Sequence, residues 1–135
     1  MSLYSIFDIA GSAMNAQNIR LNTTASNLAN VDTVSSTQEN TYRARQPVFA
    51  EMMKNFNDEH NGVQVLGIVE SNEPLRSEYN PTHAMANSDG YIFRPNVNAI
   101  DEMANMISAS RSYQTNVEVL NTAKQMMMKT LALGQ

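Results

Sequence analysis

The sequence predicts a mainly α-helical protein in which long N- and C-terminal helices form an antiparallel coiled coil, with a small β-rich insert between them. Small and apolar residues recur every three or four positions near both ends, which is the period of an α-helix. All four prolines lie between these segments, where they favour turns and short strands. We therefore divide the chain into an N-terminal helix segment (residues 1–33), a β-rich insert (34–96) and a C-terminal helix segment (97–135).

The N-terminal helix is predicted over residues 5–30, with Ser5 as its cap and Asp8 in the capping-box position. One face of this helix is small or polar about as often as it is large and apolar. Such a face buries too little area to secure a long helix alone, although it allows close approach of a neighbouring helix. An ordinary amphipathic helix on the chain's own core is the alternative. The face consists of Ile6, Ala10, Ala13, Gln17, Leu21, Thr24 and Leu28.

The middle of the chain is predicted to form a small β insert, too lightly hydrophobic to be a large enzyme core. Strands are expected at residues 42–49, 63–70 and 91–93, where β-branched and aromatic residues gather. Turn-forming residues separate these strands at residues 55–62 and 80–90. The insert is therefore expected to hold a few short strands joined by loops.

The C-terminal helix is predicted over residues 98–133, with Asn98 as its N-cap, acidic residues in its first turn and Gly134 after its end. A helix of this length spans about 54 Å, which is more than a small globule needs. Its face turns polar midway, as that of the first helix does, so the two helices could run antiparallel with matching stretches. This face consists of Ile100, Met103, Ile107, Ser110, Gln114, Val117, Leu120, Met127 and Leu131.

Composition excludes several functional classes. The net charge is −4 and no cluster of basic residues is present, which argues against binding of nucleic acid or of a membrane surface. The chain has no cysteine, so disulfides, thiol catalysis and cysteine–zinc sites are excluded. No apolar run approaches the roughly 18–20 residues that span a bilayer. The N-terminus lacks the pattern of a secretory signal peptide, which by itself would indicate a cytoplasmic protein.

No catalytic, metal or cofactor site is predicted, and we expect neither an enzyme nor a small-molecule substrate. His60 and His83 stand in separate polar loops without a second ligand at metal-binding spacing. Carboxylates such as Glu70, Glu73 and Glu78 have no surroundings that would separate their pKa values for acid–base work. The serines at 108, 110 and 112 lie within a predicted helix without a nucleophile elbow.

Two motifs resemble those of bacterial flagellar axial proteins. Residues 26–33 (SNLANVDT) resemble the motif that closes the N-terminal helix in this family, and residues 108–121 (SASRSYQTNVEVLN) resemble its C-terminal motif. The short length, the spacer at residues 34–41 and the Gly90-Tyr91 and Pro95-Asn96 pairs are similar to the proximal-rod member of the flagellar basal-body rod family. The resemblance covers nearly the whole chain.

The resemblance implies a structural subunit of the rod, the drive shaft between the rotor ring and the hook. It implies that the terminal helices form an inner coiled-coil layer around the export channel, while the insert contacts adjacent subunits. Implied partners are copies of the chain, other rod proteins, rotor-ring and export-apparatus proteins, and the flagellar type III secretion system. Export by that system without a cleaved signal replaces the cytoplasmic prediction with a periplasm-spanning location. We expect both helix faces, together with Asn30, to form the assembly interface.

Three alternatives remain open from the sequence. A helical adaptor or secretion chaperone would also use paired helices and an acidic surface, although it would not need a β insert. A small cell-wall hydrolase would need an acidic pair in a cleft, which the sequence does not offer. Within the resembling family, the B-type rod protein is the nearest alternative.

Overall fold

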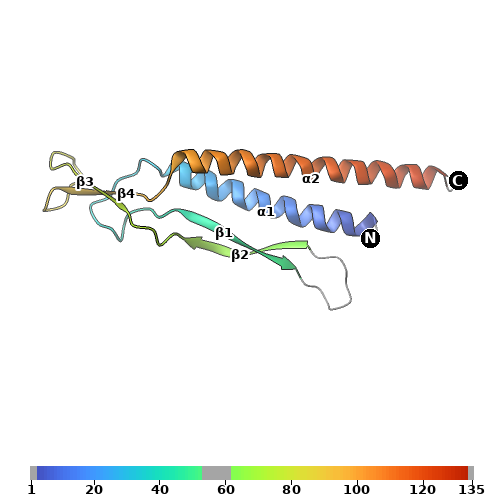
Figure 1. Cartoon of the computed structure of the whole chain (residues 1–135), viewed down its shortest axis with the longest axis horizontal. Coiled ribbons are helices and arrows are strands. Elements are labelled where there is room, and N and C mark those ends of the chain that lie inside the picture. The colour runs from blue at the N-terminus through green and yellow to red at the C-terminus, as the bar shows by residue number, and fades with distance from the viewer. Residues whose placement is uncertain (1–2, 53–61, 134–135) are drawn as a thin grey trace.

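A computed structural model describes residues 3–52 and 62–133 and shows two long helices with a small antiparallel β region between them (Figure 1). The chain is mainly helical, as predicted. In order along the chain, the elements are α1 (Leu3–Ala29), β1 (Arg45–Met52), β2 (Gly62–Glu70), β3 (Arg76–Tyr79), β4 (Tyr91–Arg94) and α2 (Ala99–Leu133).

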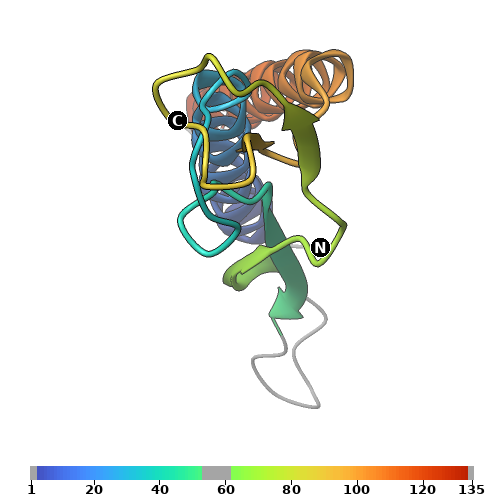
Figure 2. The same cartoon turned by 90° about the vertical axis from the view of Figure 1, so that its left-hand side faces the viewer.

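Helix α1 lies in the middle of an elongated molecule. Helix α2 packs along one side of α1 in the opposite direction, and the β1–β2 sheet packs along another side (Figures 1 and 2). With 27 residues in α1 and 35 in α2, the helices measure about 40 Å and about 52 Å. Helix α2 therefore continues past the start of α1 (Figure 1). We call this the distal end, and the end where α1 finishes and α2 begins the junction end.

The two helix starts differ in how well the sequence predicted them. At α2 the prediction is confirmed, because the Ile100 N–H donates to Asn98 Oδ1 at 3.1 Å and Asn98 Nδ2 donates to Asp101 at 2.8 Å. At α1 the predicted cap is wrong. The helix begins at Leu3, so Ser5 lies inside it and is buried. The predicted helix end at Gly134 lies outside the described residues.

Among its described residues, the insert contains two separate two-stranded antiparallel sheets. Strands β1 and β2 pair from Arg45↔Glu70 to Met52↔Gly62, with a register shift at Val48/Phe49. Strand β1 begins three residues later than predicted, because residues 42–44 make side-chain and backbone bonds to α1 and to Asn96. Loops and turns make up much of the rest of the insert.

The second sheet pairs β3 with β4, and the sequence did not predict β3. All four residues of β3 are exposed and lack apolar alternation. Cross-strand contacts stabilise it instead: Arg94 Nε donates to Glu78 at 2.8 Å, and the Tyr79 and Tyr91 rings meet edge to face at 5.2 Å. Gly90 ends the loop before β4 with a φ of +80°, and a Cβ there would lie 2.8 Å from the Tyr79 ring.

The largest buried side chains gather at the junction end rather than along the helices. Ile92 and Val97 are at most 2% exposed, and Pro95 and Asn27 are equally buried. Along the helix pair, the buried residues are mostly small, such as Ala10, Ala16, Ala109 and Ala123. Small side chains let the helices approach closely but bury little apolar area. The chain's own core is therefore concentrated where the helices meet the insert.

Candidate assembly interface

The predicted face of α2 lies largely on the outside of the molecule. Ile100 is 77% exposed, Met103 53%, Ile107 54% and Leu131 72%. The first three residues follow one another at helical spacing, so they form one apolar stripe on the first turns of α2. We call Ile100, Met103 and Ile107 the outward stripe. Of the other predicted members, Gln114 is exposed, whereas Ser110, Val117, Leu120 and Met127 are half-buried.

The predicted face of α1 is more enclosed. Ala10 and Thr24 are buried, while Ile6, Ala13, Gln17, Leu21, Leu28 and Asn30 are half-buried. Ile6 lies in a shallow hollow with α2 residues around Ala123, and Thr24 lies in another with Glu102 and Asn105. At least these parts of the α1 face therefore meet α2.

The residues of α2 that are buried differ from those of the predicted stripe. Glu102, Ala109 and Ala123 are the buried residues of this helix, and they are spaced by seven and fourteen positions. Helix α2 thus buries small and polar residues, and the large apolar residues of its first turns face outward. The four polar positions expected to match between the helices, Gln17, Thr24, Ser110 and Gln114, do not share one buried seam, since Gln114 is exposed.

The polar contacts between the helices involve residues that the sequence analysis did not select. Arg20 donates to Asn105 Oδ1 at 2.9 Å, and Asn27 Nδ2 donates to Glu102 Oε1 at 3.1 Å. Gln17 Oε1 is buried and has no hydrogen-bond partner within the described part of the chain. An unsatisfied buried oxygen of this kind lowers stability.

Asn27 connects three parts of the chain at the junction end. Its Oδ1 accepts hydrogen bonds from Tyr42 Oη at 2.8 Å and from the Arg45 N–H at 2.9 Å. Its Nδ2 donates to the Arg45 carbonyl at 2.8 Å as well as to Glu102. The side chain is 1% exposed. We call Asn27, Tyr42, Arg45 and Glu102 the Asn27 junction.

Glu102 brings a carboxyl group into this junction. Burial raises the pKa of Glu102 above its usual range, and the neighbouring Asp101 acts in the same direction. The hydrogen bond from Asn27 and the charge of Arg20 act in the opposite direction, and burial outweighs them. The shift follows from enclosure between α1 and α2 and indicates a structural carboxyl group.

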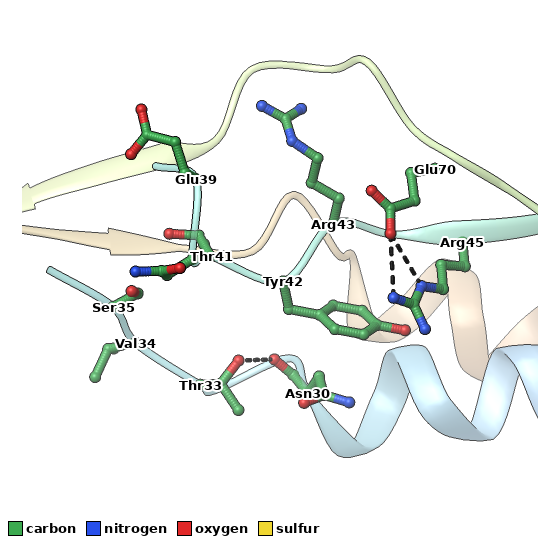
Figure 3. Close-up of a pocket in the computed structure, with 11 residues that line it drawn as sticks. Asn30, Thr33, Val34, Ser35, Glu39, Thr41, Tyr42, Arg43, Arg45 and Glu70 are labelled. Carbon is green, nitrogen blue, oxygen red and sulfur yellow. Dashed lines mark hydrogen bonds and ion pairs between the residues drawn. The ribbon is translucent and has the colours of Figure 1, made fainter. Parts of the chain in front are cut away.

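An open polar hollow of about 470 Å³ lies beside the junction, lined by the segment after α1 and by the ends of β1 and β2 (Figure 3). Arg45 is paired with Glu70 across the sheet at 3.1 Å, and Arg43 donates to the carbonyls of Ser71 and Glu73. Thr33 donates to the Asn30 carbonyl at 2.7 Å. Both arginines of the hollow are thus bound within the chain.

A second exposed apolar group lies on the insert. Leu66, Ile68 and Val69 of β2 are each more than half exposed, and Val48 and Phe49 of β1 are partly exposed. The sequence predicted β2 but gave no indication of which residues would remain uncovered, since that depends on how the sheet lies against α1. Patches of this kind are typical of interaction surfaces.

The residues considered for chemistry have ordinary structural contacts. His83 Nδ1 accepts a bond from the Met85 N–H in its loop, and Glu70 and Glu78 pair with arginines. His60 and the loop acids beside it lie outside the described residues. Within residues 3–52 and 62–133, no cluster of three or more potential metal ligands is found, and neither helix is apolar enough over its length to cross a membrane.

Comparisons with known proteins identify the family. Residues 7–34 match the family model described as "Flagella basal body rod protein", and residues 88–133 match "Flagellar basal body rod FlgEFG protein C-terminal". Over the full length of both chains, the sequence is 50% identical to the flagellar basal-body rod protein FlgC of Salmonella typhimurium and 51% identical to that of Yersinia enterocolitica. The chain belongs to the FlgC family of flagellar basal-body rod proteins. The FlgC protein of Buchnera aphidicola from Acyrthosiphon pisum is 48% identical over 139 aligned residues.

Family membership confirms the resemblance found in the sequence. The chain is a structural subunit of the flagellar basal-body rod and assembles with other basal-body proteins. These relatives are structural rod proteins, which fits the expected absence of enzymatic activity, and they do not support the adaptor or chaperone alternative. Asn27 lies in the first matched segment and Glu102 in the second, so their hydrogen bond joins the two family-matched parts.

The sequence analysis missed the Asn27 junction. Asn27 lies inside the motif that carried the resemblance to the family. The helical periodicity of α1, however, places Asn27 beside the predicted face rather than on it. A buried asparagine leaves no apolar signal in a sequence, and its partners lie up to 75 residues away. Only a three-dimensional arrangement brings them together.

Proposed function

We propose that the chain polymerises through its terminal helices to form part of the proximal rod, contributing to the drive shaft and to the wall of its export channel. The helices act in this proposal as an antiparallel coiled coil, with α2 presenting its outward stripe to neighbours. The predicted faces of α1 and α2 and Asn30 form the assembly interface. Buried α2 positions seven and fourteen residues apart support the coiled-coil packing.

The outward stripe is the observation that carries this proposal. In a self-contained two-helix protein, large apolar residues would pack between the helices and small or polar ones would face water. Here Ile100, Met103 and Ile107 are more than half exposed, while the residues buried along the helix pair are mostly small or polar. Covering the stripe with a neighbouring subunit would bury apolar area that the chain alone leaves in water.

The β insert supplies the second contact. The β1–β2 sheet lies on a different side of α1 from α2 (Figure 2), and Leu66, Ile68 and Val69 of β2 are exposed. Two unlike surfaces on one subunit favour heterologous contacts, which produce a helical shaft rather than a closed ring when they do not close. Adjacent copies, other rod proteins and proteins of the rotor ring and export apparatus are the proposed partners.

Export by the flagellar type III secretion system, unfolded and without a cleaved signal, would deliver the subunit to a rod that spans the periplasm. The small and polar residues buried between α1 and α2 suit this route, because helices that bury little apolar area against each other are marginal until neighbours cover them. Circular dichroism of the isolated chain tests this step. Fully helical terminal segments in a chain that stays monomeric would contradict it.

The assembly proposal is tested by deleting the gene and complementing it with variants, scored by electron microscopy of basal bodies. Ile107→Glu should abolish rods, because a charge in the outward stripe would have to be buried in the assembly. Ser108→Glu places the same charge at an exposed neighbouring position off the stripe, and should restore rods. Both substitutions are at exposed positions, so monomer stability should change by less than about 0.5 kcal/mol.

Two results would count against the proposal. Intact rods in the deletion strain would show that the chain is dispensable for the shaft. Rods of normal number and length with Ile107→Glu would show that the outward stripe is not part of the assembly interface.

A further inference from the structure

Asn27 uses its full hydrogen-bonding capacity inside the protein. A side-chain amide offers two donors and one oxygen with two lone pairs. In Asn27 both donors are used, toward the Arg45 carbonyl and Glu102, and the oxygen accepts from Tyr42 and the Arg45 N–H. All four distances lie between 2.8 and 3.1 Å in a side chain that is 1% exposed. No water is needed to complete this arrangement.

The four bonds come from different parts of the molecule. Asn27 itself lies in the last turn of α1, Glu102 lies in the first turns of α2, and Tyr42 and Arg45 lie where the chain enters β1. A rotation of the insert about the end of α1 would break the bonds to Tyr42 and Arg45 together. A separation of the helices would break the bond to Glu102. The Asn27 side chain thus restrains both the rotation of the insert and the separation of the helices.

The insert side of this connection is itself held firmly. Asn96, just before α2, accepts from the Ala44 N–H at 2.8 Å and donates to the Glu73 carbonyl at 3.0 Å. The Ser71 N–H donates to the Ala44 carbonyl at 2.7 Å. These bonds tie the segment before β1 to the segment after β2. A constraint at Arg45 therefore acts on the sheet and not only on a loose loop.

A second contact between α1 and the insert exists further along the helix. The Val63 N–H donates to Ser12 Oγ at 3.1 Å, and a Cβ on Gly62 would lie 2.7 Å from the same oxygen. This contact is a single bond to one hydroxyl group. The sheet also packs along α1, but the directional contacts between the helix and the insert, which are hydrogen bonds, lie mainly at Asn27.

We propose that Asn27 is a positioning residue that fixes the β insert at one orientation on the helix pair, and that subunits assemble only in this orientation. The link between orientation and assembly rests on the proposed function, because the outward stripe and the exposed residues of β2 must meet neighbours at the same time. A subunit whose insert pivots presents only one of the two surfaces correctly. The fixed orientation of the insert is a property of the single subunit and does not depend on assembly.

The decisive variant is Asn27→Asp, which keeps the shape of the side chain and removes both donors. It also places a carboxylate against Glu102. Adding Glu102→Gln restores a donor facing position 27 with the roles of the two side chains exchanged. Asn18→Asp makes the same chemical change at an exposed position of α1, keeps the oxygen that accepts from Asn22, and serves as the matched control.

Orientation is measured directly by the distance between two spin labels. The chain has no cysteine, so Leu66→Cys on β2 and Ser108→Cys on α2 label two exposed positions, away from the Ser12 contact and from the distal end of α2. The wild-type background should give one narrow distance distribution. Asn27→Asp should broaden it at least twofold, Asn27→Asp with Glu102→Gln should narrow it again, and Asn18→Asp should leave it unchanged. Helix content is followed by circular dichroism.

Assembly is measured in the same series by complementation. Asn27→Asp should lower the number of rods at least tenfold, and the double variant should recover at least half of that loss on a logarithmic scale. Tyr42→Phe removes the hydroxyl that donates to Asn27 and that also lies 3.3 Å from Ser26 Oγ on the same helix. It is expected to fold, so it covers the case in which Asn27→Asp fails to fold. It should broaden the distance distribution and lower the number of rods severalfold.

The outcomes separate the two levels of the proposal. A narrow distribution in both Asn27→Asp and Tyr42→Phe would overturn the positioning role. A broadened distribution with wild-type numbers of rods would overturn the link between orientation and assembly. If the wild-type chain itself fails to restore rods, the proposed function is wrong, and the label distances still decide the positioning role.

Discussion

The junction end and the distal end of the helix pair differ in what surrounds them. At the junction end, α1 finishes against a polar network and beside the largest buried side chains. At the distal end, α2 continues past the start of α1 (Figure 1), and its Leu131 and Leu133 are 72% and 89% exposed. The junction end is closed by contacts within one chain, through Asn27, Ile92 and Val97. The distal end is held mainly by small residues such as Ala123. This difference indicates which part of the subunit can be ordered alone and which part depends on neighbours.

The largest expected contrast comes from truncating one apolar side chain at each end. Ile92→Ala should lower the free energy of unfolding by about 3 kcal/mol, because Ile92 is fully buried and its removal leaves a cavity. Leu131→Ala should change it by less than about 0.5 kcal/mol, since the side chain lies mostly in water. Urea titrations of both variants measure this difference. Equal losses would show that the distal end is also closed within one chain.

Enlarging the buried alanines of α2 tests the helix contact itself. Ala109→Leu should cost about 1–3 kcal/mol, because Ala109 has no exposed surface and the nearby Asn27–Glu102 bond prevents the helices from separating. Ala123→Leu, toward the distal end, should cost less, because α1 can move aside there. Thermal unfolding of the two variants provides the comparison. A larger loss at Ala123 would indicate that the distal end is the more tightly packed one.

Gln17 lies between the two ends of the helix pair, and removing its unsatisfied oxygen should raise the stability of the chain. Gln17→Leu removes a buried acceptor that has no partner in the described structure, and should stabilise the chain by about 1 kcal/mol. Gln114→Leu, at an exposed position of the other predicted polar stretch, should give no such gain. Denaturant midpoints measure both. A loss of stability in Gln17→Leu would mean that this amide is satisfied in solution.

The smallest expected effect concerns the charge of Glu102. Because its pKa is raised in the folded state, stability from this group is fully present below the usual carboxyl pKa and is lost as the pH rises through the raised value. Glu102→Gln keeps an acceptor for Asn27 and removes this dependence. Relative to the wild type, the variant should therefore become more stable as the pH rises from acidic to neutral.

Unfolding of both proteins across that pH range checks the sign of the effect. The charged groups near Glu102 are Arg20 on α1 and Asp101 on its own helix. A variant that becomes less stable than the wild type toward neutral pH would show that attraction to Arg20 and to the start of α2 outweighs burial.

Much of the local structure follows from the sequence because it depends on neighbouring residues. The Asn98 cap, the absence of proline from both helices and the β-branched run of β2 each act within a few positions. Strand β3 has no such signal, because its residues are held by Arg94 and Tyr91 on the partner strand. The start of α1 was wrong by two residues, since Ser5 is used inside the helix rather than as a cap.

By itself, the sequence determined two long terminal helices, a small β insert and the family. Only the tertiary structure decided which side of α2 faces α1 and which remains in water. Periodicity shows that Ile100, Met103 and Ile107 share a face, but it does not say whether the partner lies in the same chain. On α2 the inner side is taken by Glu102, Ala109 and Ala123, because close helix packing favours small residues and Asn27 of α1 donates a hydrogen bond to Glu102.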